Sequence, residues 1–254
     1  MAGTVSSAPH PLQVSYRSAM SIDPEVLGST RRSLHAVGEH VLGAALFQGR
    51  HRIGLRQFTG GFSTQNYLHI RDGAAVERRA MVVGTDLVVR DDDLNGGTIE
   101  ERAPITTLRD AGRLVDVEPG LSGECGYTPG PLPDLDEPQP VDSEAAAVLA
   151  ELTAIGYAAL VILTAHYVDE DPAEIQLWPE HFDLATHFAE VNYGLSPGDE
   201  GHPHPYVYVG PWTPPAQGGF WNEPFGASLT LESLPTVDEV LTFFGKGHEL
   251  ASDL

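Results

Sequence analysis

The segment E-I-Q-L-W-P-E-H-F-D-L-A-T-H-F-A-E, residues 174–190, decides how we expect the chain to fold. From residue 180 onward its polar and apolar side chains alternate, and this alternation predicts a strand with one face on the core. His181, Asp183 and His187 would share the polar face. Phe182 and Phe188 would lie on the opposite, apolar face. One strand would then present two imidazoles and a carboxylate on the same side.

Helices are predicted on both sides of this segment. In residues 24–47 apolar residues recur at helical spacing, with Asp23 as N-cap and Pro24 as the first helical residue. Residues 143–167 are almost continuously apolar and rich in strong helix formers, which predicts a helix buried between layers. Shorter helices are predicted from Thr106 or Thr107 to Val115 and from Thr236 onward.

Short strands and turns fill most of the remaining chain. Residues 91–97, D-D-D-L-N-G-G, predict a solvated turn, because Asn-Gly adopts positive φ at little cost. Residues 192–204 predict a loop. Helices and strands mix without regular βαβ alternation, so we predict an α+β fold, with a mostly antiparallel sheet packed by three to four helices. The predicted strands cover residues 51–58, 66–71, 80–90, 101–105, 206–209 and 227–231.

The 254 residues suffice for one large domain or two small ones. Residues 1–22 are expected to form a loosely ordered lead-in. Residues 23–254 are expected to form a single α+β domain. The Gly/Pro-rich segment 119–140 divides this domain into two possible subdomains, residues 23–118 and 141–254.

The composition argues against several classes of partner. With 36 acidic and 14 basic residues the net charge is −22, and nucleic-acid binding is disfavoured because it needs clustered Lys and Arg. The single cysteine, Cys125, excludes an intramolecular disulfide and a cysteine-based zinc cluster. Residues 1–20 do not have the pattern of a secretory signal, and no apolar run approaches the roughly 18 residues that span a bilayer. We therefore expect neither a nucleic-acid partner nor a membrane.

The polar face of the central segment suggests a metal site. A histidine and a carboxylate two residues apart on a strand, His181 and Asp183, lie about 6–7 Å apart on one face, which suits two ligands of one ion. His202 is the preferred third ligand, with His204 second. His187 would lie about 20 Å from His181 along an extended strand, too far to share the ion. Such a set would bind a divalent metal, either Fe, Zn or Mn.

Two other interpretations of this face stay open. His181 and Asp183 could form a hydrogen bond that organises a polar sheet face, or they could act together in metal-free acid–base catalysis. Glu180 joins the catalytic candidates if Pro179 introduces a bulge that turns its carboxylate to the same face.

Aromatic residues gather in the segment that follows. All three tryptophans and several tyrosines and phenylalanines fall between residues 178 and 225, many of them beside Gly or Pro at strand ends. Aromatic walls with a few polar groups are typical of small-molecule pockets, although a second hydrophobic core would give the same pattern. The candidate substrate-binding residues are Trp178, Tyr206, Tyr208, Trp212, Trp221 and Asn222.

Four motifs in this half carry a resemblance. They are W-P-E-H-F-D-L-A (178–185), N-Y-G-x-S-P-G-D (192–199), H-P-x-P-Y-x-Y-V-G-P-W (202–212) and F-W-N-x-P-F-G-A (220–227). Together they resemble an uncharacterised family of actinobacterial proteins. The resemblance implies a cytoplasmic protein and brings no known activity with it.

The sequence as a whole predicts a metal-dependent enzyme acting on a small organic substrate in an aromatic-lined pocket. No Walker A, G-x-G-x-x-G, G-x-S-x-G or H-E-x-x-H motif is present, which disfavours the commonest nucleotide and hydrolase chemistries. The alternative is a non-enzymatic small-molecule-binding or scaffolding protein with a structural His–Asp pair. No signal for an oligomeric state is found.

Overall fold

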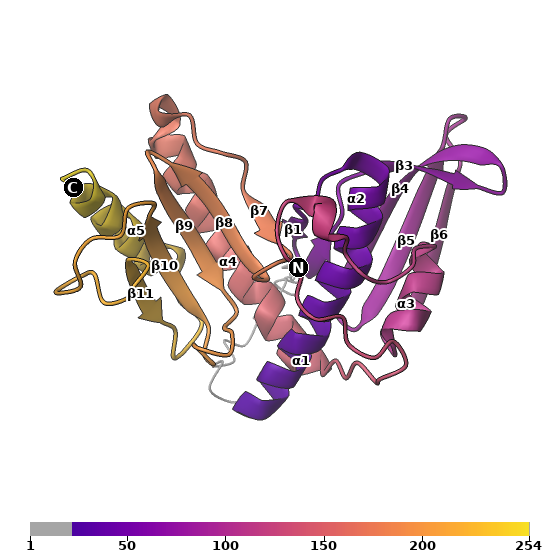
Figure 1. The fold of residues 1–254 in the computed structure, drawn as a ribbon, viewed down its shortest axis with the longest axis horizontal. Coiled ribbons are helices and arrows are strands. Elements are labelled where there is room, and N and C mark those ends of the chain that lie inside the picture. The colour runs from indigo at the N-terminus through magenta and orange to yellow at the C-terminus, as the bar shows by residue number, and fades with distance from the viewer. Residues whose placement is uncertain (1–21, 254) are drawn as a thin grey trace, which may run out of the picture.

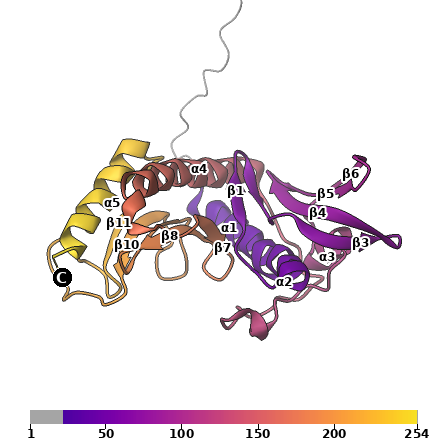
Figure 2. The same ribbon diagram turned by 90° about the horizontal axis from the view of Figure 1, so that it is seen from above.

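The computed structural model describes residues 22–253 and has an α+β fold, as predicted (Figure 1). The strands are divided between two antiparallel sheets, one in each half of the chain. Figures 1 and 2 show that helices cover opposite faces of the two sheets. The N-terminal helices lie in front of their sheet in Figure 1, and the two C-terminal helices lie behind theirs. One face of the C-terminal sheet is therefore left without a helix and lies beside the N-terminal helix.

The predicted helix over residues 24–47 is confirmed and extends to Arg50. It consists of α1 (Pro24–Val37), a π-helical turn η2 (Gly38–Gly43) and α2 (Ala44–Arg50). The side chain of Asp23 caps its start by accepting from the backbone N–H of Glu25.

The N-terminal sheet contains six strands in the order β1-β2-β4-β5-β6, with β3 also paired to β4. The predicted turn over residues 91–97 is wrong at its start, because β5 continues through Asp93. α3 (Leu108–Val115), capped by Thr107 as predicted, packs against this sheet. The strands are β1 (Arg56–Phe58), β2 (Gly61–Ser63), β3 (Tyr67–Arg71), β4 (Ala74–Val83), β5 (Asp86–Asp93) and β6 (Thr98–Pro104).

A long connection with one 3-10 turn, η3 (Gly123–Cys125), leads to α4 (Ser143–His166), and a second 3-10 turn, η4 (Val168–Glu170), follows. α4 contacts both sheets. The predicted burial between layers is correct for only one side of the helix, since Val161 and Ile162 on the other side are exposed. By length and hydropathy α4 passes the test for a membrane span, which corrects the expectation that no stretch approaches one. A core helix of a soluble protein passes the same test.

The C-terminal sheet has the strand order β11-β10-β9-β8-β7. α5 (Val237–Ala251) packs behind it and begins with a capping box formed by Thr236 and Glu239. The strands are β7 (Gln176–Trp178), β8 (Asp183–Phe188), β9 (Val191–Ser196), β10 (Tyr206–Pro211) and β11 (Ala227–Thr230).

Two sequence-based boundaries in this half are corrected. The segment 180–190 is not one strand, because residues 179–182 form a turn between β7 and β8. Phe182 adopts φ +53° there, which is unusual for a bulky residue, and its ring packs against Phe62 and His35. The predicted loop 192–204 begins later than expected, since residues 192–196 belong to β9.

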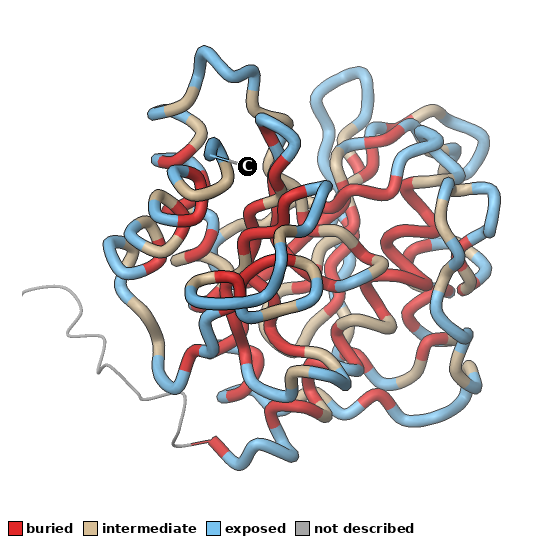
Figure 3. Tube along the Cα trace, turned by 60° about the vertical axis from the view of Figure 1, so that its left-hand side comes forward, coloured by how far each residue is buried: buried red, intermediate tan, exposed pale blue. Residues whose placement is uncertain are grey.

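Buried apolar residues form a cluster that runs through both halves (Figure 3). At the junction Leu55 and Leu177 exchange backbone hydrogen bonds of 2.9 and 3.0 Å, which link the two sheets. The predicted lead-in, residues 1–22, falls outside the described residues except for Ile22, which is buried in the cluster.

Candidate functional site

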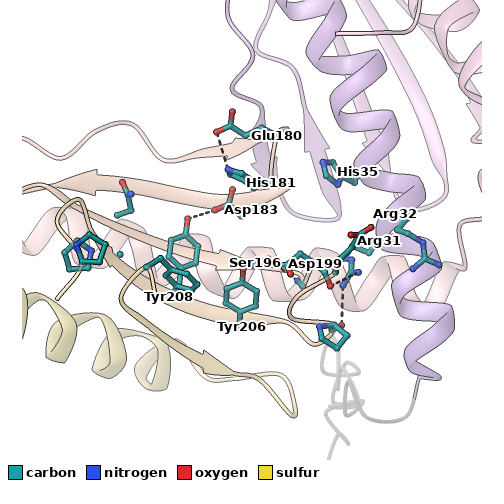
Figure 4. Close-up of a pocket in the computed structure, with 18 of the residues that line it drawn as sticks. Arg31, Arg32, His35, Glu180, His181, Asp183, Ser196, Asp199, Tyr206 and Tyr208 are labelled. Carbon is teal, nitrogen blue, oxygen red and sulfur yellow. Dashed lines mark hydrogen bonds and ion pairs between the residues drawn. The ribbon is translucent and has the colours of Figure 1, made fainter. Parts of the chain in front are cut away.

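A cavity of ≈ 1080 Å³ opens on the helix-free face of the C-terminal sheet (Figure 4). β8, β9 and β10 form its floor. α1, the 179–182 turn, the loop after β9 and the segment after β10 contribute to its walls. The polar face of β8 therefore opens into a cavity rather than being sealed beneath the loop.

The floor is shaped by a glycine in the middle of the sheet. Gly194 on β9 is paired with Ala185 on one side and Tyr208 on the other. A Cβ at Gly194 would lie 2.5 Å from ring carbons of Tyr208, so the ring lies directly on the glycine backbone. Because nothing blocks this path, the Tyr208 hydroxyl crosses β9 and donates to Oδ2 of Asp183 on β8.

Asp183 differs from the other polar groups of the cavity in its burial and in its hydrogen bonding. Its side chain is buried, at 5% relative exposure, and its Oδ1 has no hydrogen-bond partner among residues 22–253. Burial raises the pKa of Asp183, and the Tyr208 hydrogen bond and the nearby His181 offset this only in part. Burial and the neighbouring Asp183 also raise the pKa of Tyr208 well above its usual value. Both groups therefore hold their protons more strongly than they would in water.

A second carboxylate, Asp199, behaves in the opposite way. It accepts hydrogen bonds from the Tyr206 hydroxyl at 2.8 Å and from the backbone N–H groups of Gly201 and His202 at 2.7 Å each. Burial alone would raise the pKa of Asp199, but these hydrogen bonds outweigh it and the pKa is lowered. Asp199 thus stays charged and fixes the loop after β9.

Arg31 of α1 closes this end of the cavity. Its guanidinium donates to the backbone carbonyls of Pro203 at 3.3 Å and Asp199 at 3.4 Å, so the loop is attached to α1. Burial and the adjacent Arg32 lower the pKa of Arg31. Arg32 also lines the cavity and is exposed to solvent.

The wall between the two sheets contains His35 and the 179–182 turn. Nε2 of His35 lies 2.7 Å from the carbonyl oxygen of Pro179, and its ring stacks on Phe182. Burial lowers the pKa of His35, which favours the neutral imidazole. His181 is 74% exposed, and its Nε2 lies 3.7 Å from Oε1 of Glu180.

The structure brings three of the predicted catalytic and metal residues together and leaves one apart. His181, Asp183 and Glu180 all line the cavity, although the first and last reach it from the turn rather than from a strand. His202 instead lies 3.1 Å from Oε1 of Glu223. Within the described chain, no three His, Cys, Asp or Glu side chains are arranged to hold a metal ion. The predicted donor set therefore does not fit a metal, and we derive no chemical step through one.

Neither His204, the second choice for the third ligand, nor His187, which strand spacing excluded from the set, joins a common centre among residues 22–253. His187 lies on β8, where its ring is 5.7 Å from that of Trp212. His204 is exposed in the loop after β9.

Half of the predicted substrate-binding residues line the cavity. Tyr206, Tyr208 and Trp212 do so, together with Phe225. Trp221 is buried in the core cluster, and both ends of the Asn222 amide bond to the backbone of Ser228. Trp178 pairs with Asp183 across β7 and β8 but is not part of the lining.

Sequence reasoning missed the contribution of α1. The residues predicted for the site from sequence do not include Arg31, Arg32 or His35. A signal was present, since Arg31 and His35 are four residues apart and share one face of the helix. Searches for similar proteins add no assignment, because no family model, no curated protein and no solved structure matches this chain.

Proposed function

We propose that this protein binds a small organic molecule in the cavity above β8, β9 and β10, with Asp183 and Tyr208 as its central polar contacts. One observation carries the proposal: Oδ1 of Asp183 is buried at the cavity without a hydrogen-bond partner in residues 22–253. Leaving such an atom unpaired costs about 1–3 kcal/mol, and most buried polar atoms in native proteins have a partner. His40 Nδ1 and the Tyr67 hydroxyl also lack one in residues 22–253, but of the three residues Asp183 alone lines this cavity. A ligand that donates a hydrogen bond would remove this cost.

The size and lining of the cavity support a small ligand. Its volume of ≈ 1080 Å³ is close to the upper end of the roughly 300–1,000 Å³ typical of small-molecule sites. Aromatic side chains and a few polar groups line it, as in such sites generally. This concave shape favours a ligand site over the alternative of a scaffolding surface.

Acid–base catalysis on the bound molecule is a second candidate, favoured by the raised pKa of Asp183. A carboxyl group exchanges protons most effectively when its pKa lies near the working pH, and burial moves Asp183 in that direction. Tyr208 would hold the carboxyl in place. A metal-dependent version of this chemistry would require His202 to leave Glu223.

A fragment screen tests the binding proposal. Ligand-detected NMR on the full chain should find fragments that bind in the millimolar range and shift backbone signals of β8 and β10. Asp183→Asn should weaken these hits by tenfold or more. Glu223→Gln, which changes a carboxylate outside the cavity lining, should leave them unchanged.

Two results would contradict the proposal. One is the absence of any fragment that shifts the signals of the cavity residues. The other is a set of hits whose affinities are the same in wild type and in Asp183→Asn, since these would bind without the unpaired carboxyl.

A further inference from the structure

Carboxyl groups outnumber guanidinium groups around the cavity. Glu180, Asp183, Asp199 and Glu200 line it, against Arg31 and Arg32. Arg31 is already bonded to two backbone carbonyls and lies beside Asp199. Arg32 is exposed at the α1 side of the cavity, away from the floor formed by the sheet. A ligand group that reaches the floor therefore enters a region of negative potential.

Aromatic rings form a corner beside the buried carboxyl. The ring of Tyr208 lies 6.2 Å from those of Tyr206 and Phe225, at interplanar angles of 50° and 84°. Their faces carry negative charge density and attract cations, most strongly where water is excluded. A carboxylate next to aromatic faces is the arrangement that proteins use to hold ammonium groups.

We propose that the ligand of this cavity is an organic cation, whose ammonium group donates a hydrogen bond to Oδ1 of Asp183 while its carbon chain packs on Tyr208 and Phe225. This inference rests on the proposed function and names its ligand class. An anion would face the carboxyl groups that line the cavity, and a neutral donor would leave the charge of Asp183 unbalanced. An ammonium group satisfies the oxygen and neutralises the charge together.

The proposal has a pH signature. The titratable groups facing Asp183 are Tyr206 and Tyr208 from β10, and Glu180 and His181 from the 179–182 turn. Binding of an ammonium group requires the carboxylate form of Asp183, so below its pKa the ligand must displace a proton. Affinity should rise with pH through this pKa and fall again when the ligand amine loses its own proton, near pH 10 for a simple alkylamine.

Three probes of matched shape test the proposal: 2-phenylethylamine, 2-phenylethanol and 3-phenylpropanoate. Their affinities for the full chain are measured by NMR titration at pH 7.5. The amine should bind at least tenfold more tightly than the alcohol, and the carboxylate should bind most weakly. Asp183→Asn should remove the preference for the amine, so that the amine and the alcohol bind this variant with equal affinity. Glu223→Gln, a change of a carboxylate outside the cavity lining, should alter the affinity for the amine less than threefold.

The results of these titrations can overturn the cation inference without overturning the proposed function. If the alcohol or the carboxylate binds as tightly as the amine, the cation inference is overturned and the small-molecule site stands. If none of the three probes and no fragment binds in the cavity, both fall. Should Asp183→Asn fail to fold, wild type decides the question. Its affinity for the amine must then rise with pH through the raised pKa of Asp183 while that for the alcohol does not rise, and two parallel profiles would overturn the inference.

Discussion

Each sheet of this protein buries one aspartate, and the hydrogen-bond partners of the two aspartates are very different. Asp91 on β5 is 2% exposed and receives hydrogen bonds of 2.7 and 2.8 Å from Arg78 and of 2.9 Å from Arg71. Asp183 on β8 is 5% exposed and, within residues 22–253, receives one side-chain hydrogen bond, from Tyr208. The first lies in a fully satisfied network and the second at a cavity with one oxygen unpaired.

The different partners send the two pKa values in opposite directions. Burial would raise the pKa of Asp91, but hydrogen bonds and charge from Arg78 and Arg71 outweigh it, and the pKa is lowered. At Asp183 burial prevails and the pKa is raised. Burial of a carboxyl therefore does not by itself indicate a site, whereas burial without a compensating charge marks a candidate.

The network at Asp91 has a structural role. Arg78 also donates to the carbonyl of Val115 at 2.7 Å, at the end of α3, and thereby connects that helix to the sheet. Both carboxylate oxygens of Asp91 are bonded to arginine, whereas within residues 22–253 no comparable network holds Asp183.

The largest effect on stability is expected from removing Arg78, the main hydrogen-bond partner of Asp91. Arg78→Met should destabilise the fold by about 3–5 kcal/mol, because it leaves Asp91 buried with Arg71 as its remaining cation. Urea unfolding followed by circular dichroism measures this change. Arg90→Met, which removes the exposed partner of Asp92, serves as the control and should leave the urea midpoint unchanged. Equal shifts in the two variants would contradict the assigned role of Arg78.

An intermediate effect is expected where Tyr208 crosses the sheet. Gly194→Ala should cost about 1–3 kcal/mol, because its Cβ would displace the Tyr208 ring and break the bond to Asp183. Gly245→Ala within α5 meets no neighbour and should stabilise by about 0.5–1 kcal/mol. Gly194→Ala should also weaken every fragment that binds in the cavity. A variant of unchanged stability and affinity would show that Tyr208 need not lie on Gly194.

The smallest effect is expected on the pH dependence of stability, which should have opposite signs for Asp183 and Asp91. The folded pKa of Asp183 lies above the ordinary value of 3.8, so folding takes up a proton between these two values and wild type loses stability relative to Asp183→Asn as pH rises through this window. The pKa of Asp91 lies below 3.8, so wild type loses stability relative to Asp91→Asn as pH falls through that lower window. Each pKa unit corresponds to about 1.4 kcal/mol.

Urea unfolding of the three proteins between pH 3 and pH 8 measures both slopes. Slopes of the same sign for the two aspartates would remove the distinction between the structural network and the site.

Local sequence signals predicted most of the secondary structure. Capping residues gave correct helix starts at Asp23, Thr107 and Thr236, because a side-chain oxygen that accepts from the first turn is a local interaction. Local reasoning failed at the start of the predicted turn over residues 91–97, where β5 continues through Asp93. Local composition suggested a solvated turn, but Arg78 and Arg71 lie on other strands and draw Asp91 into the interior.

The candidate site was predicted in part. Asp183, Tyr206, Tyr208 and Trp212 line the cavity as strand alternation and aromatic clustering suggested. The predicted common strand face of His181 and Asp183 assumed an unbroken strand, and the left-handed backbone of Phe182 ends it. Packing of Phe182 against Phe62, 120 positions earlier in the chain, offsets that strain, and no local pattern reports it.

By itself the sequence determined the helices, most of the strands and hence the α+β class, since periodicity and capping depend on neighbours within a few residues. The tertiary structure decided which buried carboxyl would be neutralised and which would be left facing a cavity. That choice depends on contacts such as those from Arg31 to Asp199 and Pro203, 168 and 172 residues away. Such contacts arise when the two sheets pack around a shared core, and their free energy belongs to the assembled fold rather than to any one segment.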